Sequence, residues 1–217
     1  MMRHERMRRA MVVGGVALGL LGPGVMAQPS GEQGRDELVS ASVAREDALN
    51  LLLEASKHEN ALVRANAIEA LEGASGRIGD VALRGLSDPN EGVRTVAAMV
   101  IGRAKLRETA PAARALLSDS SPYARAAAIY ALRRCGFDEN PTPLAEMVAG
   151  HHDARVRAHA AFILGELGDK SAIPLLRQAA MSPVIRATSA ERRLLELQIA
   201  EALVKLGDER ELQTIRA

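Results

Sequence analysis

Four segments of this chain repeat one another at intervals of thirty to thirty-two residues, and this period constrains the fold more than any other feature. The register is marked by an aliphatic residue followed by arginine, at Val63-Arg64, Val93-Arg94, Ala124-Arg125 and Val156-Arg157. Two neighbouring columns also agree, with members Ala67, Ala97, Ala128 and Ala160 in one and Leu71, Ile101, Leu132 and Leu164 in the other. A fixed period of this length is typical of units that stack into a solenoid, because one unit cannot bury its apolar face alone.

Residues 153–180 contain one complete unit. Apolar residues recur there at three- and four-residue steps, as expected for one face of a helix, at Val156, Ala160, Ile163, Leu164 and Leu167. Gly168 suits the left-handed residue that ends a helix, and Asp169 can cap the next one. A shorter apolar stripe then follows, formed by Ile173, Leu175, Leu176 and Ala179. The pattern predicts two antiparallel helices joined by a tight turn.

Residues 38–217 are therefore predicted to form one all-α domain, an α-solenoid of about five helix pairs with atypical ends. The first four units span 58–86, 87–117, 118–149 and 153–180. The fifth carries an insertion and a longer helix from Ser189 to Leu206, with Thr188 and Glu191 placed for a capping box. Residues 38–56 and 208–217 are interpreted as terminal caps, and residues 28–37 as a flexible leader. At the start of the second unit, Asp88 before Pro89 is the predicted helix cap.

The repeats resemble HEAT repeats of the short bacterial type, close to the phycobilisome-lyase HEAT-like group, over roughly residues 58–217. The residues that carry the resemblance are the pairs Asp88 with Arg94 and Asp119 with Arg125, the Leu-Gly-Asp turn at 167–169, and the column Pro111, Pro143 and Pro174. The resemblance implies a ladder of Asp–Arg hydrogen bonds between neighbouring repeats through those two pairs. His58 and His151 stand where the first and fourth repeats would carry the aspartate.

The arginine of the register mark recurs once per repeat, at Arg64, Arg94, Arg125 and Arg157. This column has two interpretations. It is either a structural ladder that covers the seam between repeats, or a basic stripe for an anionic partner.

Residues 1–27 have the composition of a secretory signal peptide. Four arginines precede an apolar run from Met11 to Leu21, and Val25-Met26-Ala27 predicts cleavage after Ala27. The alternative is a membrane anchor, although the apolar run is about half the ~20 residues that a spanning helix needs. The Arg8-Arg9 pair leaves both the twin-arginine and the general secretory routes open. We therefore expect an exported protein, periplasmic or extracellular, with no stable membrane insertion after cleavage.

The charge argues against a nucleic-acid partner. The whole chain is formally +1, and residues 1–27 contribute +3 through four arginines and one glutamate, so the remainder is near −2. Phosphate contacts from basic residues dominate nucleic-acid affinity, and this chain offers no net excess of them.

Sequence motifs predict no catalytic, cofactor or metal residues. Neither a phosphate-binding glycine loop nor a Gly-x-Ser-x-Gly elbow occurs outside residues 1–27. His151, His152, Asp153 and His159 cluster at the start of the fourth repeat, where a zinc site is the less favoured interpretation. Cys135 shares a column with Leu167 and Leu206, which favours a buried core thiol over a nucleophile or an intermolecular disulfide.

These observations favour a non-enzymatic, exported scaffold that presents a curved helical surface to a protein partner. The second helices line the concave side in HEAT solenoids, so the candidate contact residues are Arg84, Arg114, Glu146, Arg177 and Gln178. The alternatives are a lyase-like or chaperone-like role, which the phycobilisome-lyase resemblance suggests, and a regulatory partner of an envelope protein.

Overall fold

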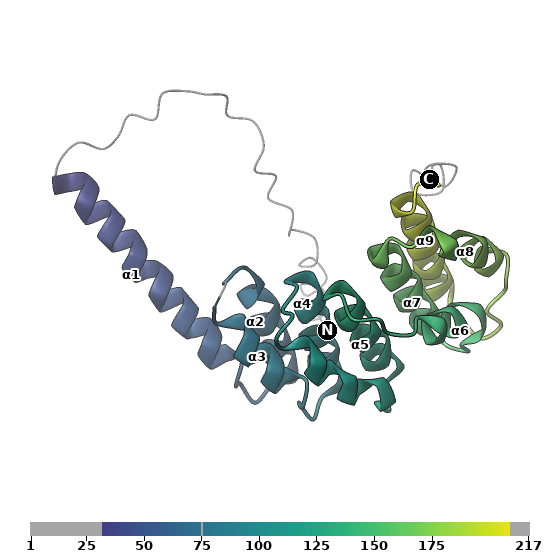
Figure 1. Ribbon diagram of the computed structural model, residues 1–217, viewed down its shortest axis with the longest axis horizontal. Coiled ribbons are helices and arrows are strands. Elements are labelled where there is room, and N and C mark those ends of the chain that lie inside the picture. Colours follow the sequence, from purple (N-terminus) through teal and green to yellow (C-terminus); the bar gives the residue numbers. More distant parts are fainter. Residues whose placement is uncertain (1–31, 75, 209–217) are drawn as a thin grey trace, which may run out of the picture. The chain divides into compact units, whose positions relative to one another are not determined.

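The computed structural model describes residues 32–74 and 76–208, and side chains from Ser40 onward. Residues 1–43 and 44–217 form two separate units. The predicted signal peptide and its cleavage site at Ala27 lie outside the described residues, as does most of the predicted C-terminal cap. The described residues contain helices and no strand (Figure 1). None of these helices is long and apolar enough to span a bilayer.

The N-terminal region differs from the prediction. A single 24-residue helix, α1 (Glu32–Ala55), spans the described part of the predicted leader and nearly all of the predicted cap. Residues 32–37, predicted to be flexible, are already helical because this polar stretch contains no proline and continues into the helical pattern of residues 38–55. Within the second unit, Leu49, Leu52 and Leu53 pack against the apolar cluster of the first repeat.

The repeats follow the predicted boundaries closely. Repeats one and two consist of α2 (Ala61–Ala70) with the 3₁₀ turn η1 (Leu71–Gly73), α3 (Ile78–Gly85), α4 (Glu91–Arg103) and η2 (Ala110–Ser118). The second helix of repeat two, η2, is a 3₁₀ helix of nine residues and not an α-helix. Repeats three and four consist of α5 (Pro122–Arg134), α6 (Thr142–Gly150), α7 (Ala154–Leu167), the 3₁₀ turn η3 (Lys170–Ala172) and α8 (Ile173–Ala180).

The fifth repeat begins with α9 (Ser189–Lys205). Its predicted capping box is confirmed, because the Thr188 side chain accepts from the Glu191 N–H while the Glu191 side chain accepts from the Thr188 N–H. The predicted end of α7 is also confirmed, with Gly168 in the left-handed region at φ 76°.

The aspartate at the start of repeat two does not cap α4. Asn90 is the cap, and its side-chain oxygen accepts from the N–H groups of Gly92 and Val93. Asp88 instead accepts from the N–H of Asn90, two residues after it in the chain. Both residue types can cap a helix, so the sequence alone does not choose between them. The consequence is that the Asp88 carboxylate remains available for a partner outside its own repeat.

The two predicted core columns are buried. Ala67, Ala97, Ala128 and Ala160 are at most 3% exposed, and Leu71, Ile101, Leu132 and Leu164 at most 6% exposed. The first helix of each repeat packs on the first helix of the next, giving the series α2, α4, α5, α7 and α9. Alanine at each crossing lets neighbouring helices approach without ordering long side chains, so the stack has a continuous interior of small aliphatic residues.

Candidate partner-binding site

Two arginines of the register column form a ladder between successive repeats. Arg64 donates from Nε and Nη2 to the two carboxylate oxygens of Asp88, both at 2.7 Å. Arg94 donates in the same way to Asp119, at 2.7 and 2.8 Å. Each arginine thus binds the aspartate of the next repeat, 24 or 25 residues ahead in the chain. These two-pronged charge-assisted bonds join repeat one to two and repeat two to three.

The Asp and Arg residues that lie six apart in the sequence do not form the side-chain pairs that the resemblance implied. Arg94 reaches Asp88 only through its main-chain carbonyl, at 2.9 Å, and Arg125 reaches Asp119 through the corresponding carbonyl at 2.6 Å. The hydrogen bonds from Arg64 and Arg94 lower the pKa of the Asp88 and Asp119 carboxyls, and burial opposes this effect. A structural ladder therefore accounts for Arg64 and Arg94, and a continuous basic stripe does not.

The ladder ends between repeats three and four. The residue in the aspartate column there is His151, whose Nδ1 accepts from the Asp153 N–H at 3.1 Å. Arg157, in the fourth repeat, is buried and donates to the main-chain carbonyls of Val148 and Ala179 at 2.8 and 3.3 Å. Burial lowers the pKa of the Arg157 guanidinium. Within residues 32–74 and 76–208, neither Arg125 nor Arg157 forms a salt bridge to a carboxylate.

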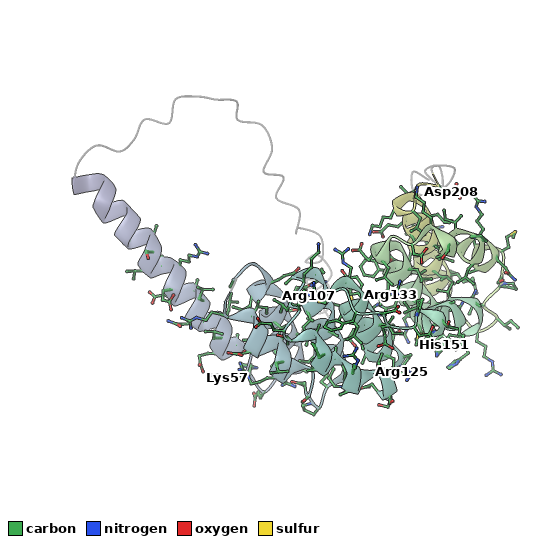
Figure 2. The ribbon with its side chains drawn as sticks, viewed as in Figure 1. Lys57, Arg107, Arg125, Arg133, His151 and Asp208 are labelled. Carbon is green, nitrogen blue, oxygen red and sulfur yellow. The ribbon has the colours of Figure 1, made fainter. Side chains whose placement is uncertain are left out.

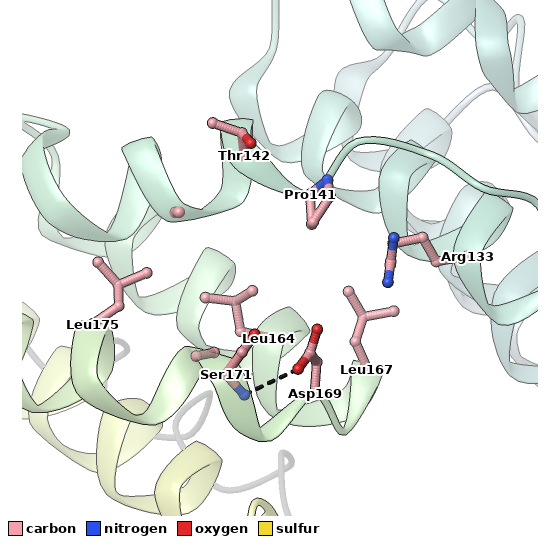
Figure 3. Close-up of a pocket in the computed structure, with 10 residues that line it drawn as sticks. Arg133, Pro141, Thr142, Leu164, Leu167, Asp169, Ser171 and Leu175 are labelled. Atoms are coloured by element: carbon pink, nitrogen blue, oxygen red, sulfur yellow. Dashed lines mark hydrogen bonds between the residues drawn. The ribbon is translucent and has the colours of Figure 1, made fainter.

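A cleft of about 330 Å³ opens at this same joint, between the end of α5 and helices α6, α7 and α8. Its walls are mainly aliphatic, formed by Pro141, Ala145, Leu164, Leu167, Ala172 and Leu175. Its polar lining consists of Arg133, Thr142, Asp169 and Ser171. Figure 3 shows Arg133 and Asp169 on the same side of the cleft, with Leu175 on the opposite side. The cleft can accept one or two aliphatic side chains beside polar groups.

One column of the repeat explains why the cleft occurs here. The residues that follow Leu71, Ile101, Leu132 and Leu164 are Glu72, Gly102, Arg133 and Gly165. A Cβ added at Gly102 would lie 2.5 Å from the Tyr130 ring, and one at Gly165 would lie 2.8 Å from Ala202 Cα. Glycine therefore lets α4 contact α5, and α7 contact α9, at very short range. Arg133 carries a long side chain at the equivalent place on α5, so α7 cannot approach to the same degree.

The polar groups of the cleft are held by main-chain contacts. Arg133 Nη1 donates to the Glu139 carbonyl at 2.8 Å, and Asp169 Oδ1 accepts from the Ser171 N–H at 2.9 Å. The hydrogen bonds from Ser171 lower the pKa of the Asp169 carboxyl, with a smaller contribution from the positive charge of Arg133. A cation and an anion thus lie at fixed positions beside an aliphatic surface, which suits recognition of a peptide segment.

The surface predicted from the sequence does not coincide with the cleft. Arg84, Arg114, Glu146 and Gln178 are exposed, and none of them lines the cleft. Arg114 lies over the Phe137 ring, 5.3 Å from its centroid. Arg177 is not a free surface residue, because its Nε donates to the buried carboxylate of Asp208 at 2.8 Å and its Nη2 contacts the same oxygen. Sequence reasoning did not assign Arg133 or Asp169 to a binding site, although Arg133 replaces the glycine that the neighbouring repeats carry at Gly102 and Gly165.

The histidine cluster is divided between two environments. His151 and His152 stack with ring centroids 4.5 Å apart. His159 instead packs between Tyr123 and Phe162 beside a separate, more open depression of about 370 Å³. The Nε2 atom of His159 is buried without a hydrogen-bond partner in the described part of the chain, and burial lowers the pKa of His159 to about 4. No group of three histidine, cysteine, aspartate or glutamate side chains among the described residues could hold a metal ion.

The single cysteine lies in the core. Cys135 is 2% exposed and its thiol donates to the Ile101 carbonyl at 3.5 Å. Burial raises the pKa of the Cys135 thiol, which disfavours the thiolate that a nucleophile requires.

Family comparisons agree with the repeat geometry. Residues 79–150 match the model of HEAT repeats, and residues 156–180 match the PBS lyase HEAT-like repeat. No curated protein matches the chain. These two segments therefore carry HEAT repeats, and the helices of the described residues are consistent with an α-solenoid. HEAT repeats are commonly protein-interaction scaffolds, and the HEAT fold is typically non-catalytic.

Proposed function

We propose that this protein is an exported, non-enzymatic scaffold that binds a protein partner in the cleft between its third and fourth repeats. The observation that carries the proposal is the cleft itself, where aliphatic walls lie beside Arg133 and Asp169. An extended segment of a partner can place an apolar side chain against Leu164 and Leu175. Its main-chain or polar groups then meet the fixed charges beside the cleft. Concave, mainly apolar sites with a few placed polar groups are the usual binding sites of folded proteins.

The cleft is favoured over the exposed second-helix residues because it can desolvate what it binds. Arg84, Arg114, Glu146 and Gln178 are exposed polar side chains, and exposed charges contribute little to affinity. Binding energy concentrates where apolar groups become fully buried, so we place the binding site in the cleft and not at these residues.

Two matched substitutions, each of an alanine by glutamate, test the binding site. Ala145 lies in the cleft on α6, whereas Ala115 is exposed on η2, away from the cleft. Ala145→Glu places a charged side chain in the cleft and should abolish capture of the partner from cell-envelope fractions. Ala115→Glu should leave capture intact. Circular dichroism of both variants controls for folding. Equal capture by the wild type and by folded Ala145→Glu would contradict the proposed site.

Export is supported by the signal-peptide pattern of residues 1–27. The test is the mass and the location of the protein purified from its own cells. We expect a chain that begins at Gln28, recovered from the periplasm or the medium. A chain that retains residues 1–27 and stays in the cytosol would overturn this part of the proposal.

A second candidate function, a lyase-like or chaperone-like role, is favoured by the match of residues 156–180 to the PBS lyase HEAT-like repeat. The buried thiol of Cys135 provides no accessible attachment point, and export would separate the protein from phycobilisome assembly. A change in the visible absorption spectrum of a bilin when the purified protein is added would support this candidate. Its absence would exclude the bilin version of it.

A further inference from the structure

Three arginines of the register column are held on their own repeats in the same way. Each donates from Nη1 to the main-chain carbonyls five and six residues earlier. The distances are 2.8 and 2.8 Å for Arg64, 3.1 and 2.9 Å for Arg94, and 3.1 and 2.6 Å for Arg125. In Arg64 and Arg94 this clamp directs the Nε and Nη2 edge of the guanidinium to the aspartate of the next repeat. The same clamp orients Arg125, which is labelled in Figure 2.

The residue in the corresponding position beyond Arg125 is His151. Its backbone (φ −65°, ψ 137°) nearly equals that of Asp119 (φ −62°, ψ 147°). His151 Nδ1 accepts from the N–H two residues on, as Asp119 Oδ1 does from Ser121 at 2.8 Å. The imidazole therefore reproduces the local hydrogen bond of the aspartate but supplies no carboxylate. In the described part of the chain, Arg125 Nε and Nη2 donate to no protein group.

We propose that this open edge of Arg125 binds the carboxylate of an aspartate or glutamate side chain on the partner protein. The partner thereby supplies the missing rung between repeats three and four. This inference rests on the proposed function, because it presumes a protein partner. The two filled rungs are its template, since each holds a planar carboxylate in two-pronged geometry at 2.7–2.8 Å. Arg125 is half-buried and already oriented, so little side-chain freedom remains to be lost on binding.

The test uses the purified protein with ¹⁵N-labelled arginine, and Arg125→Lys assigns the Nε–H resonance of Arg125. The probe is the pentapeptide Gly-Gly-Asp-Gly-Gly with blocked ends, titrated to millimolar concentration at constant ionic strength. The Asn analogue of this peptide is the control. We expect the aspartate peptide, and not the asparagine peptide, to shift the Arg125 resonance. Two further arms, inorganic phosphate and an all-glycine peptide with a free C-terminus, separate a side-chain carboxylate from other anions.

Two variants of His151 distinguish an open rung from an ordinary surface arginine. His151→Asp places the carboxylate within the chain, and His151→Asn is its uncharged match, with the same acceptor for the Asp153 N–H. The Arg125 shift should persist in His151→Asn and disappear in His151→Asp. The urea midpoint of unfolding should be higher for His151→Asp than for His151→Asn.

The proposal is overturned by no Arg125 shift in the wild type, by an unchanged shift in His151→Asp, or by equal urea midpoints for the two variants. It is also overturned if phosphate or the free C-terminus shifts Arg125 and the aspartate peptide does not. These measurements need no native partner. A negative result therefore leaves the cleft untouched, and failure of the cleft variants leaves Arg125 to be judged by the peptide.

Discussion

The joint between repeats two and three and the joint between repeats three and four are built from the same parts and differ in how they close. At the first, Gly102 brings α4 against Tyr130, and Arg94 grips Asp119 across the seam. At the second, Arg133 stands at the position of Gly102, and His151 stands at the position of Asp119. The second joint carries a cleft of about 330 Å³ and an arginine edge without a protein acceptor in the described residues.

The comparison separates two contributions to stacking. The apolar columns are buried at both joints, so continuity of the core does not depend on the glycine or on the ladder. Close helix contact and the Asp–Arg rung are additional features. A joint that lacks both leaves accessible surface between its helices. Two residues at one joint, Arg133 and His151, thus change how the neighbouring repeats close without changing the fold.

The largest expected difference comes from matched leucines of the core column. Leu132 is 0% exposed, whereas Leu164 is 6% exposed and lines the cleft. Leu132→Ala should lower the free energy of unfolding by about 4 kcal/mol, and Leu164→Ala by about 2 kcal/mol, because water can reach the space that the second change creates. Urea denaturation measures both values. Equal losses would show that the two joints are packed alike.

Loss of the Arg94–Asp119 rung should have the next largest effect on stability. Asp119→Ala leaves Arg94 without a carboxylate at a site where the two side chains are 10% and 15% exposed, and it should cost about 3 kcal/mol. Asp138→Ala, at an exposed position, should cost within ~0.5 kcal/mol. The Asp119 pKa lies below its ordinary value of 3.8, so its stabilising contribution is present above that value and is lost as the pH falls through the folded pKa. If the free energy of unfolding fell equally with acidic pH in the wild type and in Asp119→Ala, this role of Asp119 would be contradicted.

Mild acid should destabilise the joint between repeats three and four. His159 on α7 packs against Tyr123 of α5, and burial lowers its pKa from 6.5 to about 4. The unfolded chain therefore binds a proton between these values and the folded chain does not, so stability falls as the pH drops from 6.5 to 4. We expect a loss of about 2 kcal/mol over this range, which His159→Phe should remove. Urea midpoints at pH 7 and pH 4.5 measure it, and an identical pH dependence in both proteins would rule out His159 as the cause.

The smallest effect concerns the residue that the sequence placed on the exposed surface. Arg177 donates to the buried Asp208, so Arg177→Ala should cost about 1.5 kcal/mol. An exposed arginine without such a partner should cost within ~0.5 kcal/mol, which is the value expected for Arg84→Ala. Thermal unfolding of the two variants side by side decides between them, and equal midpoints would mean that the Arg177–Asp208 pair contributes nothing.

Periodicity predicted the interior of the repeats well because burial recurs in the sequence once per turn and once per repeat. Leu71, Ile101, Leu132 and Leu164 could be placed from spacing alone. The pairing of Arg94 with Asp119 could not, since a six-residue spacing within one repeat says nothing of which repeat the side chain faces. The Arg177–Asp208 contact depends on the path of the inserted segment, which has no counterpart in the other repeats.

The cleft was partly predictable from the sequence. Arg133 stands in the column that holds Gly102 one repeat earlier and Gly165 one repeat later, so the sequence indicated that this joint differs from its two neighbours. The depth of the space and the placement of Asp169 beside it follow from the helix packing, which spacing does not provide.

Photo-crosslinking in intact cells shows directly whether a partner binds at the joint between repeats three and four. Benzoylphenylalanine is placed at Thr142, beside the cleft, and in a second strain at Ala115, beside the closed joint. The account predicts one discrete crosslinked partner from position 142 and none from position 115. Crosslinks from position 115 with none from position 142 would show that the partner does not bind at the joint between repeats three and four.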